Sequence, residues 1–158
     1  MDIGNVPEVL TKLANRTISY FLEDLGMDIK NEYEIKSVSQ IEYLDISTLI
    51  SLSGAKSGTI GMSVSNKLAY SMVENFIFGE MEEDELKELS SENVAETLNI
   101  TIGNILPELQ VVREGGNVNI STPYTLHNCV TITKKPSGYM WLCKLYSNDE
   151  LILLTYFK

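Results

Sequence analysis

Apolar residues recur at intervals of three and four along three stretches of the chain, which is the period of an amphipathic helix. This pattern predicts helices over residues 6–25, 68–78 and about 90–112. Pro7 suits a first helical turn, and Gly26 is well placed to end the first helix. Shorter runs rich in β-branched and apolar residues predict strands. These runs span residues 29–38, 44–52, 59–64, 118–121, 129–133, 139–146 and 151–157.

Turn-forming and charged residues divide the pattern further. Residues 53–58 predict a hairpin turn between the second and third strands, and residues 147–149 predict another between the last two. Pro107 lies inside the third helical pattern, where it removes a backbone donor and must kink or break the helix. Acidic residues gather over 80–88 against a single lysine. We interpret that run as a solvated loop and an acidic helix start rather than a metal site.

A weak internal repeat relates the first helix to the third. A shift of 84 residues places identical residues on one another at several positions, among them Glu8/Glu92, Asn15/Asn99, Thr17/Thr101, Ile18/Ile102 and Leu22/Leu106. The agreement has two explanations, a chance match between two amphipathic helices or a duplicated unit of one helix followed by strands.

Length and charge narrow the class of protein. The 158 residues (17.7 kDa) suffice for a full hydrophobic core, and we expect residues 1–158 to form a single domain. A net charge of −10 gives no indication of a basic surface that could bind nucleic acid, and it disfavours binding to an anionic membrane surface. No apolar run is long enough to span a membrane, and the first residues do not resemble a signal peptide, so we expect a cytoplasmic protein.

Few residues can support metal or nucleophilic chemistry. The chain has two cysteines, Cys129 and Cys143, and one histidine, His127. These predict reduced thiols rather than a disulfide framework, and they do not suggest a zinc site. An enzyme that uses one of these three side chains stays open as an alternative, although a buried structural thiol at Cys143 is the simpler interpretation.

The third helix has two distinct faces on a helical wheel. An apolar stripe about 80° wide faces the predicted core. The stripe contains Val94, Leu98, Ile102, Ile105, Leu109 and Val112. Glu92, Glu96, Asn99 and Gly103 cluster within about 60° of one another on the opposite side.

This polar cluster can be either an ordinary solvent-exposed helix surface or a functional site. Glu and Asn are ordinary on an exposed helix face, and Glu-x-x-Asn alone is a weak motif. However, Asn99 competes for backbone groups inside a helix, and Gly103 costs about 1 kcal/mol relative to alanine. Both features fit a surface that the backbone of another molecule approaches closely.

The segment Glu96-x-x-Asn99-x-x-x-Gly103-Asn104 resembles the signature helix of the CheC/CheX family of chemotaxis phosphatases. Residues 57–65, followed by a helix containing Ala69, and residues 121–123 resemble further family segments. The resemblance extends from the first helix to about residue 130 and is closer to CheX, because only one motif is complete. In the first helix Asn15 keeps the amide position, but Lys12 replaces the acid, which indicates a degenerate copy.

The resemblance implies a phosphatase that acts on the phospho-aspartate of a CheY-like response regulator. Asn99 would hold the attacking water, and Glu96 would pair with a lysine in the active site of the regulator. Glu92 and Gly103 would contact the partner; the family often has Asp or Ser at the position of Glu92. No cofactor of its own is implied, because the regulator would supply the Mg²⁺.

The resemblance also implies an architecture and an oligomeric state. We expect an α+β fold of pseudo-duplicated helix-plus-strands units, with a mostly antiparallel sheet and two long helices packed on one face, as in CheC. A homodimer joined through strand edges is implied, to which the apolar C-terminal strands would contribute. Alternatively, those strands fill the core of the monomer. A non-catalytic CheX-like module that binds regulators or dimerises is the alternative function, favoured if Glu96 or Asn99 is buried.

Overall fold

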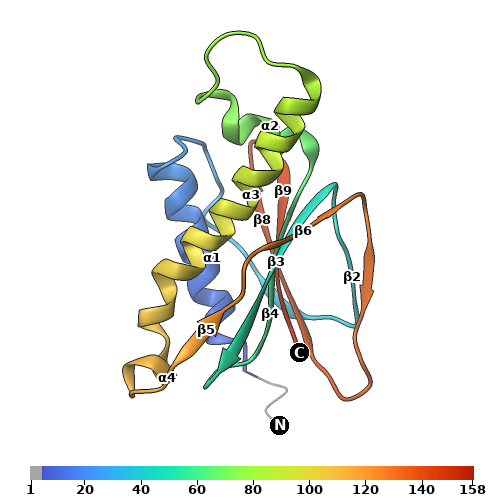
Figure 1. The fold of residues 1–158 in the computed structure, drawn as a ribbon. Coiled ribbons are helices and arrows are strands. Elements are labelled where there is room, and N and C mark those ends of the chain that lie inside the picture. Colours follow the sequence, from blue (N-terminus) through green and yellow to red (C-terminus); the bar gives the residue numbers. More distant parts are fainter. Residues whose placement is uncertain (1–4) are drawn as a thin grey trace.

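The computed structural model describes residues 5–158. Residues 1–4 lie outside the described part. The expectation that the first residues are not a signal peptide concerns mostly these residues. Two long helices, α1 (Glu8–Glu23) and α3 (Glu83–Ile105), lie side by side on one face of a sheet (Figure 1). The shorter α2 (Asn66–Glu74) packs against α3. Among the described residues, none of the helices has the length and apolar character needed to cross a membrane.

The sheet is antiparallel throughout and has the order β1-β8-β9-β4-β3-β5, with β6 also paired to β3. Its strands are β1 (Ile35–Ser37), β3 (Ile46–Gly54), β4 (Gly58–Val64), β5 (Val118–Ile120), β6 (Tyr124–His127), β8 (Met140–Ser147) and β9 (Glu150–Phe157). A separate small sheet pairs β2 (Gln40–Glu42) with β7 (Thr131–Thr133). The expected α+β fold is therefore confirmed.

Alternating side chains along the central strands give the sheet two buried faces. On β9, Ile152, Leu154 and Tyr156 belong to the core beneath the helices. Leu151 and Leu153 belong to a second cluster, which includes Ile41 of β2 and Ile132 of β7. The small sheet therefore covers the face of the main sheet opposite α1 and α3 (Figure 1).

The pairing of strands supports duplication over chance as the explanation of the repeat. The hairpins β3–β4 and β8–β9 meet at the centre of the sheet, where β4 pairs with β9. β1, from the first half, pairs with β8, whereas β5, from the second half, pairs with β3. Each half therefore supplies an outer strand to the hairpin of the other half.

The equivalent threonines of the two long helices also have equivalent surroundings. Thr17 and Thr101 are both fully buried. Each hydroxyl donates a 2.8 Å hydrogen bond to the carbonyl oxygen four residues earlier, on Leu13 and Thr97 respectively. These bonds satisfy the hydroxyl groups within the helix and allow α1 and α3 to bury matching faces.

The helix boundaries differ from the predicted ones most at the start of α3, the end of α3 and the end of α2. α3 begins at Glu83, because the acidic residues of its first turn complement the helix dipole. It ends at Ile105 and is followed by a 3₁₀ turn (Leu106–Glu108) that contains Pro107, and then by the short helix α4 (Gln110–Arg113). Proline therefore breaks the helix, as predicted. α2 ends at Glu74, four residues earlier than predicted, and is capped by Asn75.

Two strand predictions were wrong in extent. Only Ile35–Ser37 is a strand within residues 29–38, where a polar stretch separates the apolar positions. Only Thr131–Thr133 is a strand within residues 129–133, and it belongs to the small sheet. The predicted strands also do not include β2 and β6, which have three and four residues. Strands this short carry too few alternating positions for a periodic signal.

The apolar C-terminal strands lie inside the sheet. β9 is paired on both sides, by β4 and β8, and its residues Ile152–Tyr156 are buried. Their side chains fill the core of the chain itself, which is the alternative that the sequence left open. Any sheet edge that binds a second copy must therefore come from other strands.

Candidate docking and catalytic helix

The apolar stripe of α3 faces the core as predicted. Val94, Leu98 and Ile102 have no exposed surface, and Ile105 is 2% exposed. Buried polar residues extend this face on one side, because Thr97 and Thr101 bond to helix carbonyl groups and need no other partner. The remaining surface of α3 is left for polar residues.

The polar cluster predicted to carry function lies on the open side of α3. Glu92, Glu96 and Gly103 are exposed, and Asn99 is half-buried. A Cβ atom added at Gly103 would meet nothing within 4 Å, so no contact within the chain requires glycine there. The four residues are therefore brought together on one accessible face.

Neither side chain of the central pair is engaged elsewhere. Among residues 5–158, no hydrogen bond or ion pair involves the carboxylate of Glu96 or the amide of Asn99. The two residues are three positions apart, which places them on adjacent turns of the helix. A carboxylate and a carboxamide are thus available together to a molecule that approaches α3.

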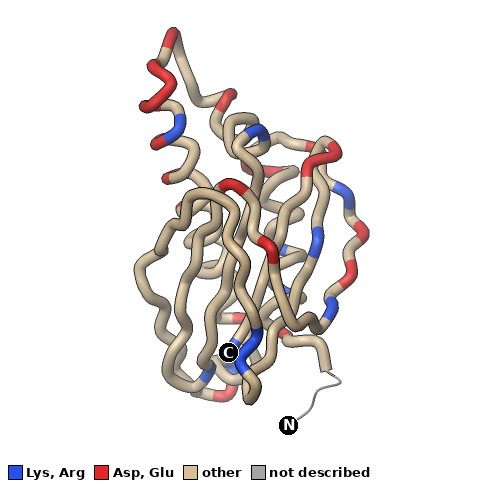
Figure 2. The backbone as a smooth tube through the Cα atoms, turned by 90° about the vertical axis from the view of Figure 1, so that its right-hand side faces the viewer, with Lys and Arg blue, Asp and Glu red and all other residues tan. Residues whose placement is uncertain are grey.

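A row of carboxylates continues along the same side of the helix. Glu88, Glu92 and Glu96 follow one another at intervals of four residues, and all three are exposed. Like charges at this spacing repel one another. The nearby Lys87 is paired instead with Glu83, with 3.6 Å between nitrogen and oxygen. Figure 2 shows further acidic residues around the start of α3, so this end of the molecule favours a cationic partner.

Contacts with α1 fix the orientation of the motif helix. The Nε atom of Arg16 donates a 2.9 Å hydrogen bond to Oδ1 of Asn104, and its other nitrogens contact Ser19 and Asp24. Arg16 thereby joins the two helices near Gly103. Arg16 could not be identified from the sequence, because nothing in its local context shows that it lies opposite Asn104.

The equivalent positions of the first helix are engaged within the chain. Oδ1 of Asn15 accepts a 2.6 Å hydrogen bond from the hydroxyl group of Tyr33. Lys12 lies 3.9 Å from the carboxylate of Glu8, measured from nitrogen to oxygen. This helix presents a cation and an occupied amide where α3 presents an acid and a free amide, so it is a degenerate copy in chemistry as well as in sequence.

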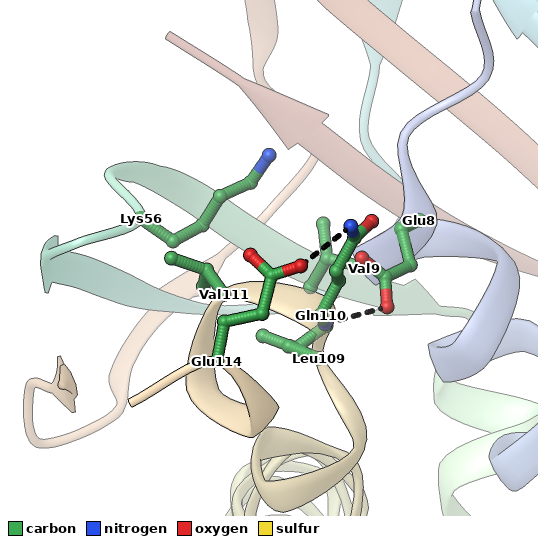
Figure 3. A pocket seen from close by; sticks show the side chains of 7 residues that line it. All are labelled: Glu8, Val9, Lys56, Leu109, Gln110, Val111 and Glu114. Carbon is green, nitrogen blue, oxygen red and sulfur yellow. Dashed lines mark hydrogen bonds between the residues drawn. The ribbon is translucent and has the colours of Figure 1, made fainter. Parts of the chain in front are cut away.

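Glu8 illustrates how the two halves have diverged. Its Oε1 atom accepts a 3.0 Å hydrogen bond from the backbone nitrogen of Gln110 at the start of α4 (Figure 3). The side chain of Gln110 in turn donates to Glu114 over 2.9 Å. These groups line a cavity of about 200 Å³ that also includes Lys56. The carboxylates there stabilise helix ends, whereas Glu92, the repeat partner of Glu8, makes no hydrogen bond or ion pair within residues 5–158.

The cysteines and the histidine do not form a second candidate centre. Cys143 is fully buried on β8, and burial raises the pKa of its thiol to about 12, so the thiol stays protonated. Cys129 is exposed and lies 3.9 Å from a carboxylate oxygen of Asp45. His127 is exposed at the end of β6. Within residues 5–158, no three His, Cys, Asp or Glu side chains are grouped to hold a metal ion.

Comparison with protein families identifies the class. The family model of the chemotaxis phosphatase CheX matches residues 46–142, which is more than half of the chain and includes Glu96, Asn99 and Gly103. The chain belongs to the CheX family. The resemblance seen in the sequence is thereby confirmed. No curated protein sequence matches the chain.

Solved structures of the CheX family share the fold at low sequence identity. CheX from Vibrio vulnificus has a TM-score of 0.73 and 18% identity, over 96% of this chain and 100% of that chain. CheX from Desulfovibrio desulfuricans has a TM-score of 0.72 and 15% identity, over 95% and 98%. The CheX–CheY–BeF₃–Mg²⁺ complex from Borrelia burgdorferi has a TM-score of 0.64 and 18% identity, over 94% of each chain.

Proposed function

We propose that this CheX-family chain hydrolyses the phospho-aspartate of a CheY-like response regulator, with α3 as both docking and catalytic element. The observation that carries the proposal is the pair Glu96 and Asn99, which lie one turn apart on the open side of α3 with both polar groups free. The match to a phosphatase family supports the reaction class, and the Borrelia complex supports the kind of partner.

The reaction needs little covalent chemistry from this chain. A water oxygen attacks phosphorus, the bond between phosphorus and the aspartate oxygen breaks, and inorganic phosphate leaves while the carboxylate of the regulator is restored. The water must lie in line with the breaking bond. A carboxamide has both donor and acceptor atoms, so Asn99 is suited to hold a water molecule in one orientation.

Glu96 is the docking group in this proposal. Its carboxylate pairs with the lysine of the regulator active site and thereby fixes the position of α3 over the phosphoryl group. Glu92 and Gly103 lie beside it and contact the regulator, and the absent side chain at position 103 permits close approach of the partner. The Mg²⁺ ion comes with the regulator, as the composition of the Borrelia complex suggests for that pair of proteins.

Phosphate release tests the proposal directly. A CheY-type receiver domain from the same organism is phosphorylated with a small-molecule donor, and free phosphate is followed with and without this chain. Substoichiometric chain is expected to increase the rate of release in proportion to its concentration. An unchanged rate, with binding intact, would favour the alternative of a non-catalytic binding module. The accessibility of Glu96 and Asn99 already argues against the buried arrangement that would have favoured that alternative.

We further propose that the chain forms a homodimer through a sheet edge. β1, a strand of three residues, covers only part of β8 at one edge of the main sheet, over Trp141–Cys143. Within residues 5–158 the outer side of β1 has no strand partner, so its backbone groups are available for pairing with a second copy. Sedimentation equilibrium is expected to give twice the chain mass at micromolar concentration. A monomer mass that persists at the highest soluble concentration would contradict the dimer.

A further inference from the structure

A cleft of about 520 Å³ lies between α3 and β6, beside the proposed catalytic pair. Its helix wall comes from the N-terminal half of α3 and its other wall from alternate residues of β6. The lining residues are Lys87, Glu88, Ser91, Glu92, Ala95, Thr125 and His127. Within the described chain, β6 pairs only with β3, so the cleft opens at an edge of the sheet.

The spacing of residues on α3 makes this cleft continuous with the catalytic pair. Ser91, Ala95 and Asn99 are four residues apart and form one row along the helix. Ser91 and Ala95 line the cleft, and Asn99 follows one turn later. The neighbouring row consists of Glu88, Glu92 and Glu96, of which the first two line the cleft. Both rows therefore lead from the cleft to the catalytic pair.

The lining of the cleft matches a basic side chain with an apolar stem. Glu88 and Glu92 supply two carboxylates without an ion-pair partner among residues 5–158, because Lys87 pairs with Glu83. Ala95 and the methyl group of Thr125 supply apolar surface between the walls. Lysine and arginine bury their methylene stems against such surface while the charged end reaches a carboxylate.

We infer that the cleft receives a second segment of the response regulator, one that carries a lysine or arginine, and that this contact selects which regulators the chain dephosphorylates. The inference rests on the proposed function. The contact lies about one to three helical turns from Asn99 and touches no reacting atom, so it acts on affinity and selectivity rather than on the chemical step.

Binding measurements on charge variants test the inference. The probe is a CheY-type receiver domain loaded with beryllofluoride and Mg²⁺, titrated into the full chain. The double variant Glu88→Gln and Glu92→Gln keeps shape and helix propensity but removes both charges. We expect about fivefold to tenfold weaker binding at low salt, and a difference that shrinks as ionic strength rises. Glu42→Gln, on the small sheet over the opposite face, is the matched control and should bind like the unmodified chain.

A steric variant provides an independent measurement. Ala95→Leu introduces a good helix former that fills the cleft, so weaker binding is expected at every salt concentration. For both sets of variants, KM should rise while kcat at saturating receiver is retained, because Glu96 and Asn99 are unchanged. A loss of kcat instead would contradict a role confined to affinity.

The outcomes separate this inference from the proposed function. If the cleft variants bind the receiver as tightly as the unmodified chain, the cleft and with it Glu92 do not contact the regulator, and the proposed roles of Glu96 and Asn99 still stand. If the chain without substitutions fails to release phosphate, the proposed function fails whatever the cleft variants show. Circular dichroism and thermal midpoints verify that each variant is folded.

Discussion

Replacing Asn99 with alanine is expected to lower the stimulated rate of phosphate release by about a hundredfold or more, with docking on the regulator nearly intact. The reason is that the amide holds the attacking water in line, and losses of this size accompany imprecise positioning of a reacting group. The amide makes no hydrogen bond within the described chain, so its removal leaves no partner unsatisfied. Stability should not fall, because alanine is the better helix former.

The repeat offers a matched control for this variant. Asn15→Ala makes the same change at the equivalent position of α1, where the amide oxygen accepts the hydrogen bond from Tyr33. That variant is expected to keep the full rate of phosphate release and to lose a little stability. Both variants are compared by phosphate release at saturating receiver and by titration with the beryllofluoride-loaded receiver. Turnover at the normal rate in Asn99→Ala would refute the role assigned to the amide.

Helical periodicity predicted the candidate site because the site depends on one rigid element. Val94, Leu98 and Ile102 fix the buried stripe of α3, and the positions of Glu96 and Asn99 on the open side then follow from 3.6 residues per turn. Local sequence chemistry also predicted the break at Pro107. Each of these features depends on interactions within a few residues along the chain.

Contacts between distant segments could not be predicted in the same way. The Arg16–Asn104 hydrogen bond joins residues 88 positions apart, and the Tyr33–Asn15 bond fixes an amide from outside its own helix. The cleft beside Ala95 exists because β6 pairs with β3 and thereby places Thr125 opposite α3. No periodic pattern in the sequence encodes these pairings, because they depend on how the strands are ordered in the sheet.

The internal repeat is understood only when the sequence pattern and the long-range contacts of the structure are considered together. In the sequence, the identities at a spacing of 84 residues allowed both chance and duplication. The exchange of β1 and β5 between the two halves and the matching Thr17 and Thr101 bonds support duplication. The divergence between Lys12 and Glu96 can then be explained. The two halves retain the same packing, but only α3 keeps a free acid and a free amide on its open side.

The charge at position 96 is expected to control docking. Glu96→Lys should weaken binding of the beryllofluoride-loaded receiver by about a hundredfold at low salt, because a favourable ion pair is replaced by repulsion from the lysine of the regulator. The loss should diminish as ionic strength rises. Phosphate release at a fixed receiver concentration should fall in parallel, because an undocked helix cannot present Asn99. The substitution places on α3 the residue type that α1 carries at Lys12.

Two further variants separate charge from shape and position. Glu96→Gln keeps the size of the side chain and is expected to bind with intermediate affinity, since it removes the attraction without adding repulsion. Glu42→Lys makes the same reversal on the small sheet, on the far side of the main sheet from α3, and should leave binding and turnover unchanged. A general effect of net charge would weaken Glu42→Lys as strongly as Glu96→Lys. Normal binding and turnover by Glu96→Lys itself would exclude the ion pair and, with it, the docking geometry on which the hydrolytic role of Asn99 depends.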